Sequence, residues 1–181
     1  MLYGAHIETG EQQFALNVVG DHEESTRAAQ RAARLSPSDP YVLAFSGVFQ
    51  AFGGEVEAGI PLVRAAIRLD PLSIRAPFRN VAGVVLFHAG RYEEALEILH
   101  ENVRLGGPDG PHMALYRAAT LVRLGRAEEA RREVENASAF PYDFDIRNFL
   151  SAFRDPQKPG ELLDSLESIG FDAETVSVAV R

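Results

Sequence analysis

A tight turn that leads into a helix is predicted by the run Gly90-Arg91-Tyr92-Glu93-Glu94-Ala95-Leu96. Glycine can adopt the left-handed backbone conformation that commonly follows the end of a helix. The two glutamates would then lie in the first turn of the next helix, where carboxylates interact favourably with the helix dipole. The run therefore predicts a junction between two helices.

Similar runs begin at three other glycines, Gly20, Gly54 and Gly125, and each is followed within a few residues by glutamates. The spacing from one glycine to the next is 34 residues (20 to 54), 36 residues (54 to 90) and 35 residues (90 to 125). A steady spacing in this range is typical of solenoids built from stacked helix pairs. The sequence therefore predicts an all-α, right-handed superhelical solenoid.

Positions at fixed distances from these glycines carry residues of similar size. Seven residues before the glycine, and five and twelve after it, the side chains are nearly all small, as closely crossing helices require: Gln13, Gly47, Gly83, Ala118; Ser25, Gly59, Ala95, Ala130; Ala32, Ala66, Asn102, Ala137. Fifteen residues after the glycine they are large and apolar: Leu35, Leu69, Leu105, Phe140. Asn102 is an exception that needs a hydrogen-bond partner. Pro61 predicts a kink or a late start in its helix.

The order glycine, aromatic, two acids and alanine at residues 90–95 resembles the tetratricopeptide repeat, and Leu69-Asp70-Pro71 resembles the end of a repeat of that family. The resemblance covers about residues 6–140. It implies about four helix pairs within residues 1–140, at about 6–37, 40–71, 75–107 and 111–140. Asp39 is expected to cap a helix that has Pro40 in its first turn.

The repeat spacing ends after Pro141. Residues 143–150 predict one further helix, and Asp155-Pro156 predicts the start of another, which ends at Gly170. A terminal repeat of a solenoid must cover its outer face. We therefore interpret residues 141–171 as C-terminal capping helices and residues 172–181 as a flexible tail.

Composition and motifs exclude several functional classes. The net charge of −8 disfavours binding to nucleic acid as the main role. No apolar run reaches the length of about 18 residues that predicts a membrane span, and no secretion signal begins the chain. There is no cysteine, phosphate-binding loop, metal-ligand cluster or activated nucleophile. We expect a cytoplasmic, bacterial protein that is not an enzyme and binds no cofactor or metal.

The resemblance to tetratricopeptide repeats implies a concave, largely apolar surface that is lined by the first helix of each pair and binds a protein or peptide. Spacing assigns ten residues to this peptide-binding face: Asn17, Val48, Phe52, Asn80, Val84, Phe87, His88, Leu115, Val122 and Arg123. The alternative is that several of them are core residues between adjacent helix pairs. An exposed wall of this kind would be covered by a partner, by a second copy in a homodimer or by the chain's own tail.

The function that this resemblance implies is that of a non-enzymatic protein–protein interaction module. An alternative comes from Ala152-Phe153-Arg154-Asp155-Pro156 and Gly170-Phe171, which together with the preceding repeats resemble the C-terminal tetratricopeptide region of bacterial class III nucleotide cyclases. That resemblance implies a regulatory or oligomerising role in signalling. No residue matches the cyclase catalytic domain, so no catalytic residue is transferred.

Overall fold

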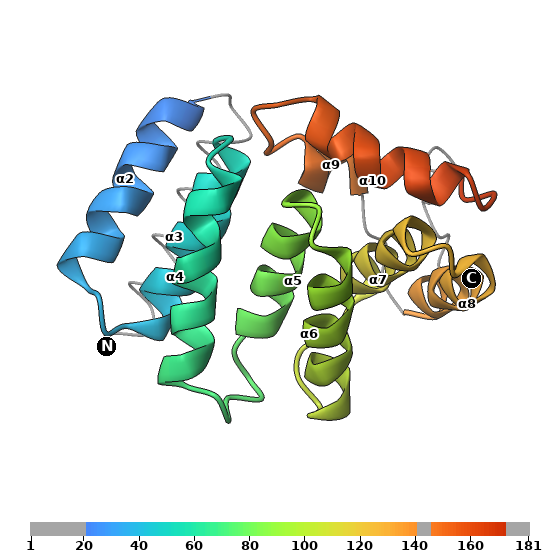
Figure 1. Cartoon of the computed structure of the whole chain (residues 1–181), viewed down its shortest axis with the longest axis horizontal. Coiled ribbons are helices and arrows are strands. Elements are labelled where there is room, and N and C mark those ends of the chain that lie inside the picture. The colour runs from blue at the N-terminus through green and yellow to red at the C-terminus, as the bar shows by residue number, and fades with distance from the viewer. Residues whose placement is uncertain (1–20, 141–145, 173–181) are drawn as a thin grey trace.

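The computed structural model describes residues 21–140 and 146–172, and within them the chain is entirely α-helical apart from turns and loops. The helices, shown in Figure 1, are α2 (His22–Leu35), α3 (Pro40–Phe52), α4 (Val56–Leu69), α5 (Phe78–His88), α6 (Tyr92–Arg104), α7 (Pro111–Arg123), α8 (Ala127–Ser138), α9 (Ile146–Leu150) and α10 (Gln157–Glu167). The all-α prediction is confirmed. The expected first helix of repeat one, with Asn17, and the tail after Asp172 lie outside the described residues.

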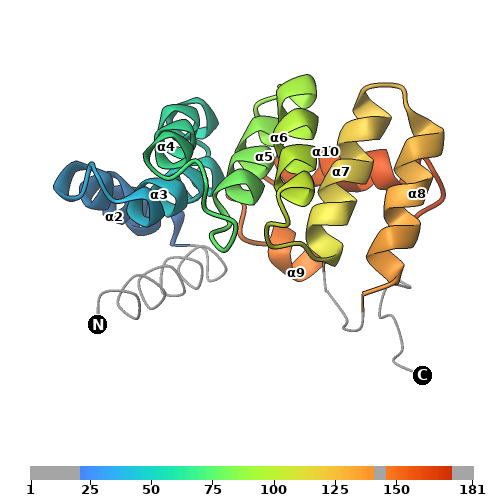
Figure 2. The ribbon, with the colours of Figure 1, turned by 90° about the horizontal axis from the view of Figure 1, so that it is seen from below.

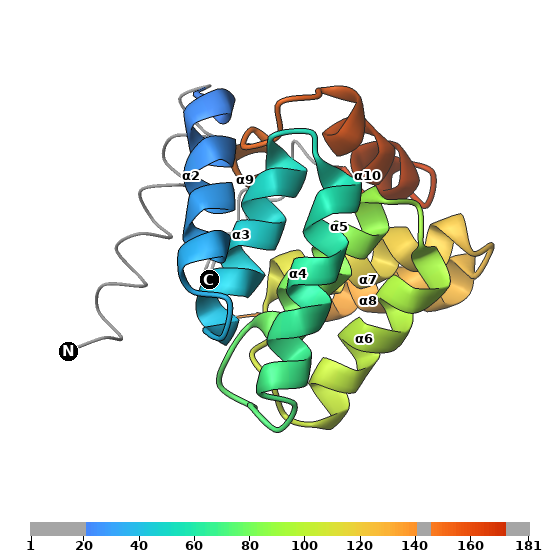
Figure 3. The ribbon, with the colours of Figure 1, turned by 60° about the vertical axis from the view of Figure 1, so that its left-hand side comes forward.

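The helices pack as successive antiparallel pairs. The closest packing is between α3 and α4, between α7 and α8, and between α5 and α6. The pairs stand side by side in an array, with α2 against α3 at one end (Figures 1 and 2). Figure 3 shows the same array with α2 and α4 turned toward the viewer. The helices α9 and α10 run across one edge of this array, so the C-terminal segment does not continue the repeat.

The turns within the pairs have the backbone conformation that the glycine pattern predicts. Gly54, Gly90 and Gly125 have φ angles of 97°, 73° and 75°, which are in the left-handed region. After Gly90, the backbone N–H of Arg91 donates to the carbonyl oxygen of Leu86 at 2.9 Å, and this bond satisfies a carbonyl at the helix end. These three glycine-aligned turns are therefore helix stops, as expected, while Gly20 lies outside the described residues.

The small residues allow close helix crossings. A Cβ atom added to Gly59 on α4 would lie 2.4 Å from the carbonyl oxygen of Gly47 on α3. A Cβ atom added to Gly83 on α5 would lie 2.5 Å from the side chain of Leu99 on α6. These distances are too short for any ordinary contact, so the crossing of each pair depends on the absence of a side chain.

Two local predictions have different outcomes. Asp39 caps α3, because its carboxylate accepts the backbone N–H groups of Tyr41 at 2.9 Å and Val42 at 3.1 Å. Of the two effects expected from Pro61, the late start is wrong, because α4 begins at Val56 and continues through the proline, and the kink stays a prediction. Proline removes its own N–H donor and its ring crowds the carbonyl four residues earlier, here that of Glu57 in the first turn, and the close packing of α4 against α3 can offset this cost.

Within the described residues, a small hydrophobic cluster lies between α3, α4 and the start of α5, and a larger one runs through the array and continues into the C-terminal segment. The larger cluster includes the buried Leu99 of α6 and Tyr116 of α7, together with Leu150, Leu162 and Leu166 of the C-terminal helices. The C-terminal helices are thus part of the core that holds the repeats. The division of the chain into four repeats, a cap and a tail remains a prediction.

Candidate functional site

The predicted binding wall lies on the first helices of the pairs, but most of it is not open to solvent. In this structure the side chains of seven of the ten residues are buried: Val48, Phe52, Asn80, Val84, Phe87, His88 and Leu115. Val122 is half-buried and Arg123 is exposed. Of the two alternatives left open by the sequence, the structure therefore agrees with the one in which several of these residues are core. Their role in binding a partner remains a prediction.

The C-terminal segment covers one end of this wall. The ring of Phe153 lies 4.5 Å from the ring of Phe52 and 4.3 Å from that of His88, measured between centroids. Phe149, four residues earlier, lies 6.0 Å from Phe52 in an edge-on arrangement. The backbone N–H of Arg154 donates to the carbonyl oxygen of Phe52 at 2.8 Å. Two aromatic side chains and one main-chain hydrogen bond thus attach the segment to α3 and α5.

The rest of the segment is held by α10. This helix packs against α7 and buries Leu162 and Leu166 completely. It is followed by Gly170, with a φ angle of 88°, and then by the buried ring of Phe171. The backbone N–H of Phe171 donates to the carbonyl oxygen of Leu166 at 3.2 Å, as in a glycine-terminated helix end. The helix and its stop therefore match the sequence expectation, and they anchor the covering segment.

A buried histidine lies where the wall meets this segment. Nε2 of His88 is 2.8 Å from the hydroxyl oxygen of Tyr116, and the two groups share a hydrogen bond. Burial, assisted by the positive charge of Lys158, lowers the pKa of His88 to about 3. Burial also raises the pKa of Tyr116 well above its usual range. Both side chains are neutral near pH 7, so the pair joins α5 to α7 and is not poised for proton transfer.

The wall's asparagine has a structural contact. The side-chain amide of Asn80 donates to the carbonyl oxygen of Pro108 at 2.7 Å, and that of Asn102 donates to the same oxygen at 2.7 Å. The partner expected for Asn102 is therefore confirmed. The two amides tie α5 and α6 to the loop that precedes α7.

A buried arginine on α7 was not identified from the sequence. Arg117 forms two hydrogen bonds with the carboxylate of Asp109, at 3.0 and 3.1 Å, and a third with Glu133 at 2.8 Å. Burial alone would lower the pKa of Arg117, but these carboxylates raise it. The sequence does carry a signal for this buried arginine. Arg117 directly precedes Ala118, one of the predicted small sites, and follows the loop aspartate Asp109 by eight residues.

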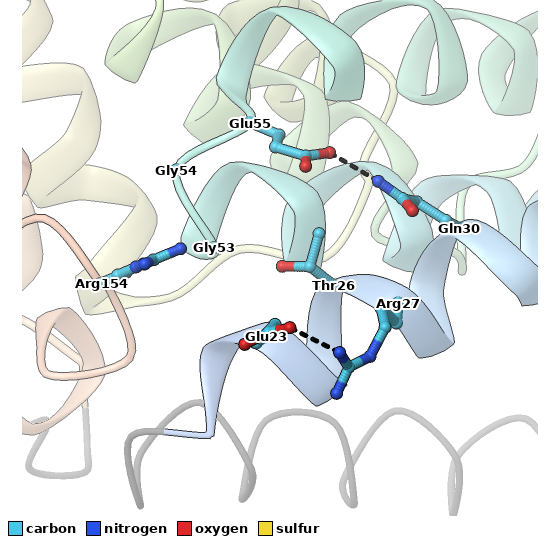
Figure 4. Close-up of a pocket in the computed structure, with 8 residues that line it drawn as sticks. All are labelled: Glu23, Thr26, Arg27, Gln30, Gly53, Gly54, Glu55 and Arg154. Carbon is cyan, nitrogen blue, oxygen red and sulfur yellow. Dashed lines mark hydrogen bonds and ion pairs between the residues drawn. The ribbon is translucent and has the colours of Figure 1, made fainter.

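Beside the C-terminal segment the surface has a hollow of about 430 Å³, shown in Figure 4. Its lining comes from α2, from the turn between α3 and α4, and from the C-terminal segment: Glu23, Thr26, Arg27, Gln30, Gly53, Gly54, Glu55 and Arg154. Glu23 pairs with Arg27 at 2.5 Å, and Gln30 donates to Glu55 at 2.8 Å. The side chain of Arg154 points toward Gly53. The lining therefore combines acidic, basic and neutral polar groups.

A second hollow, of about 450 Å³, shares Gly54 and Glu55 with the first. It extends along the first turn of α4 to Tyr92 and reaches Lys158 and Glu161 on α10. Arg123, a predicted binding residue, lies with its guanidinium carbon 5.0 Å from the centre of the Tyr92 ring. The accessible polar surface therefore borders the covered end of the wall.

Within the described parts of the chain, no cluster of three or more histidine, aspartate or glutamate side chains could hold a metal ion. Over the same residues, every helix is too short or too polar to span a lipid bilayer.

Comparisons with known proteins agree with this architecture. The family model "Tetratricopeptide repeat" matches residues 53–101 and 81–145, which together extend over just over half of the chain. The solved structure of MamA MSR-1 C2 is similar in fold, with a TM-score of 0.55 and 21% identity over 69% of this chain and 70% of that chain. No curated protein matches the chain. The resemblance to cyclase-attached repeats gains no support from these matches.

Proposed function

The chain belongs to the tetratricopeptide repeat family, and on this basis we propose that it is a non-enzymatic protein-interaction module whose concave wall binds a peptide segment bearing aromatic side chains. The observation that supports the proposal is that the ring of Phe153 contacts the rings of both Phe52 and His88. Here the chain's own C-terminal segment is the resident occupant. A partner segment that carries one aromatic residue in a short helix and a second in the turn after it, as Phe149 and Phe153 are placed, would present the same contacts.

The tethered segment controls access to the wall. A segment linked to its own binding site acts at an effective concentration in the millimolar range, so it competes strongly with a free ligand. Burial of one phenylalanine contributes about 2 kcal/mol, or roughly thirtyfold in an equilibrium constant. Removing the ring of Phe153 should therefore weaken the resident segment and make the wall available to a segment supplied in solution.

The test uses a fluorescent peptide that corresponds to residues 146–172 and measures its binding to the full chain by anisotropy. We expect the Phe153→Ala chain to bind the peptide at least tenfold more tightly than the wild-type chain does, on the thirtyfold estimate above. The control peptide carries alanine in place of Phe153 and should bind the Phe153→Ala chain about thirtyfold more weakly than the unmodified peptide does. If the Phe153→Ala chain retains its helical circular dichroism spectrum and binds both peptides equally weakly, the proposed occupant chemistry is wrong.

A homodimer remains an alternative way to fill the wall, because a second copy could supply its C-terminal segment in place of the chain's own. Light scattering at several concentrations distinguishes the two arrangements. A monomeric mass for both the wild-type and the Phe153→Ala chain supports occupation within one chain.

A further inference from the structure

The last turns of α2, α4 and α6, with the connections that follow them, form one edge of the array, opposite α10 (Figure 1). We call it the helix-end edge. Among the described residues, every large apolar side chain that is exposed lies on it: Leu35, Leu69, Leu72, Ile74, Val103 and Leu105. Single exposed leucines are normal on protein surfaces, but a concentration on one edge indicates an interaction surface.

The most exposed of these side chains project from the ends of the helices. Leu72, in the connection after α4, is 84% exposed, and Leu35, at the end of α2, is 77% exposed. Both hollows described above are lined by residues near the glycine turns, at the opposite ends of these helices. The helix-end edge therefore presents its apolar groups from projecting helix ends and connections, and this shape suits an extended surface better than a peptide.

The same edge carries unpaired positive charge. Arg34, Arg68 and Arg104 lie in the last turns of α2, α4 and α6, and Arg75 lies in the connection before α5. All four are exposed, and within residues 21–140 and 146–172 none of them forms an ion pair. The edge also carries acids, but Asp39 caps α3, Glu101 and Asp109 pair with the buried Arg79 and Arg117, and Asp70 is half-buried at the end of α4. Most arginines near the glycine turns, by contrast, are paired with glutamates.

We propose that the helix-end edge binds the surface of a membrane that contains anionic lipid. Arginines would contact the lipid phosphates while the leucines enter the boundary between headgroups and acyl chains. Charge complementarity favours this occupant over a second copy joined edge to edge, because the arginines of two such edges would repel one another. The net charge of −8 on the whole chain limits the contact to this edge.

The test is sedimentation of the full chain with vesicles at low salt. The probes are vesicles of phosphatidylcholine alone and vesicles of phosphatidylcholine mixed with phosphatidylglycerol. Two double variants remove the same charge from opposite edges: Arg68→Gln with Arg104→Gln, and Arg126→Gln with Arg131→Gln. All four side chains are exposed, so each variant should keep the helical circular dichroism spectrum.

We expect the wild-type chain to bind only the anionic vesicles and to be released by salt. The helix-end variant should bind about 25-fold more weakly, at about fivefold for each arginine, while the glycine-turn variant binds like the wild type. Leu72→Ser should also weaken binding without any change in charge. Absence of binding to anionic vesicles overturns the proposal, as does an equal loss in both double variants or binding of an acidic peptide in place of vesicles. Peptide binding at the concave wall is independent of each of these results.

Discussion

Gly59→Ala should destabilise the chain although alanine is the better helix former. The new Cβ atom would lie 2.4 Å from the carbonyl oxygen of Gly47 and 3.2 Å from its carbonyl carbon. A backbone carbonyl cannot rotate away as a flexible side chain can, so α3 and α4 would have to separate by about 1 Å to restore an ordinary contact. The substitution therefore disturbs the packing of α3 against α4 along the crossing and not only at one side chain.

The size of the effect follows from two opposing contributions. Overpacking of a buried contact costs about 1–3 kcal/mol, and replacing glycine by alanine within a helix stabilises by about 0.5–1 kcal/mol. The net result should be a loss of about 1–2 kcal/mol in the free energy of unfolding. For a chain of this length it corresponds to a melting temperature lower by about 2–8 °C.

Gly160→Ala is the matched control. Gly160 lies within α10, and a Cβ atom there would meet no atom within 4 Å. The same substitution should therefore stabilise the chain by about 0.5–1 kcal/mol. Thermal melting followed by circular dichroism measures both variants against the wild type. A Gly59→Ala chain that melts at or above the wild-type temperature would refute the view that a direct backbone contact sets the crossing of α3 and α4.

Three further substitutions test the buried side chains. Because Phe87 is completely buried, Phe87→Ala should cost about 3–5 kcal/mol in thermal or urea unfolding, and a melting temperature near that of the wild type would show that the side chain is not core. The pKa of His88 is about 3 in the folded chain and near 6.5 when unfolded, so stability should be complete above about pH 6.5 and fall by about 2 kcal/mol by pH 5; His88→Gln should reduce this pH dependence of the melting temperature. Arg117→Met leaves two carboxylates without their partner and should cost about 3 kcal/mol, against less than about 1 kcal/mol for the exposed Arg131→Ala; equal urea midpoints for the two would contradict this difference.

The features that could be predicted from the sequence are those that depend on neighbouring residues. A glycine that ends a helix adopts the left-handed backbone conformation, which other residues rarely adopt. Gly54, Gly90 and Gly125 could therefore be recognised without knowledge of the fold. The cap formed by Asp39 also involves residues two and three positions away. The small sites could be found because the repeat places them in register, and the contact between Gly47 and Gly59 satisfies that pattern.

The features that could not be predicted depend on contacts between distant parts of the chain. Phe52 is buried because Phe149 and Phe153 reach it from outside the repeating region. A repeat pattern indicates which side chains face inward, but it carries no information on what covers them. The buried ion pairs of Arg117 were missed for a similar reason, since one of its partners, Glu133, lies on the next helix. Whether the residues of the predicted binding wall are exposed or buried could therefore be learned only from the structure.

The covering of the wall sets a condition on any partner in the proposed function. The chain that places Phe153 against Phe52 keeps a competing segment permanently nearby, at an effective concentration in the millimolar range. A free partner present at about micromolar concentration would have to bind the wall roughly a thousandfold more tightly than the resident segment to occupy half of the molecules. Additional aromatic surface on the wall would strengthen the binding of the resident segment and of the free partner equally. It therefore cannot produce the thousandfold difference in affinity. The added affinity has to come from contacts that the resident segment does not make, and the part of the first hollow formed by Glu23, Arg27 and Glu55, on α2 and the turn before α4, lies where a longer partner segment could find them.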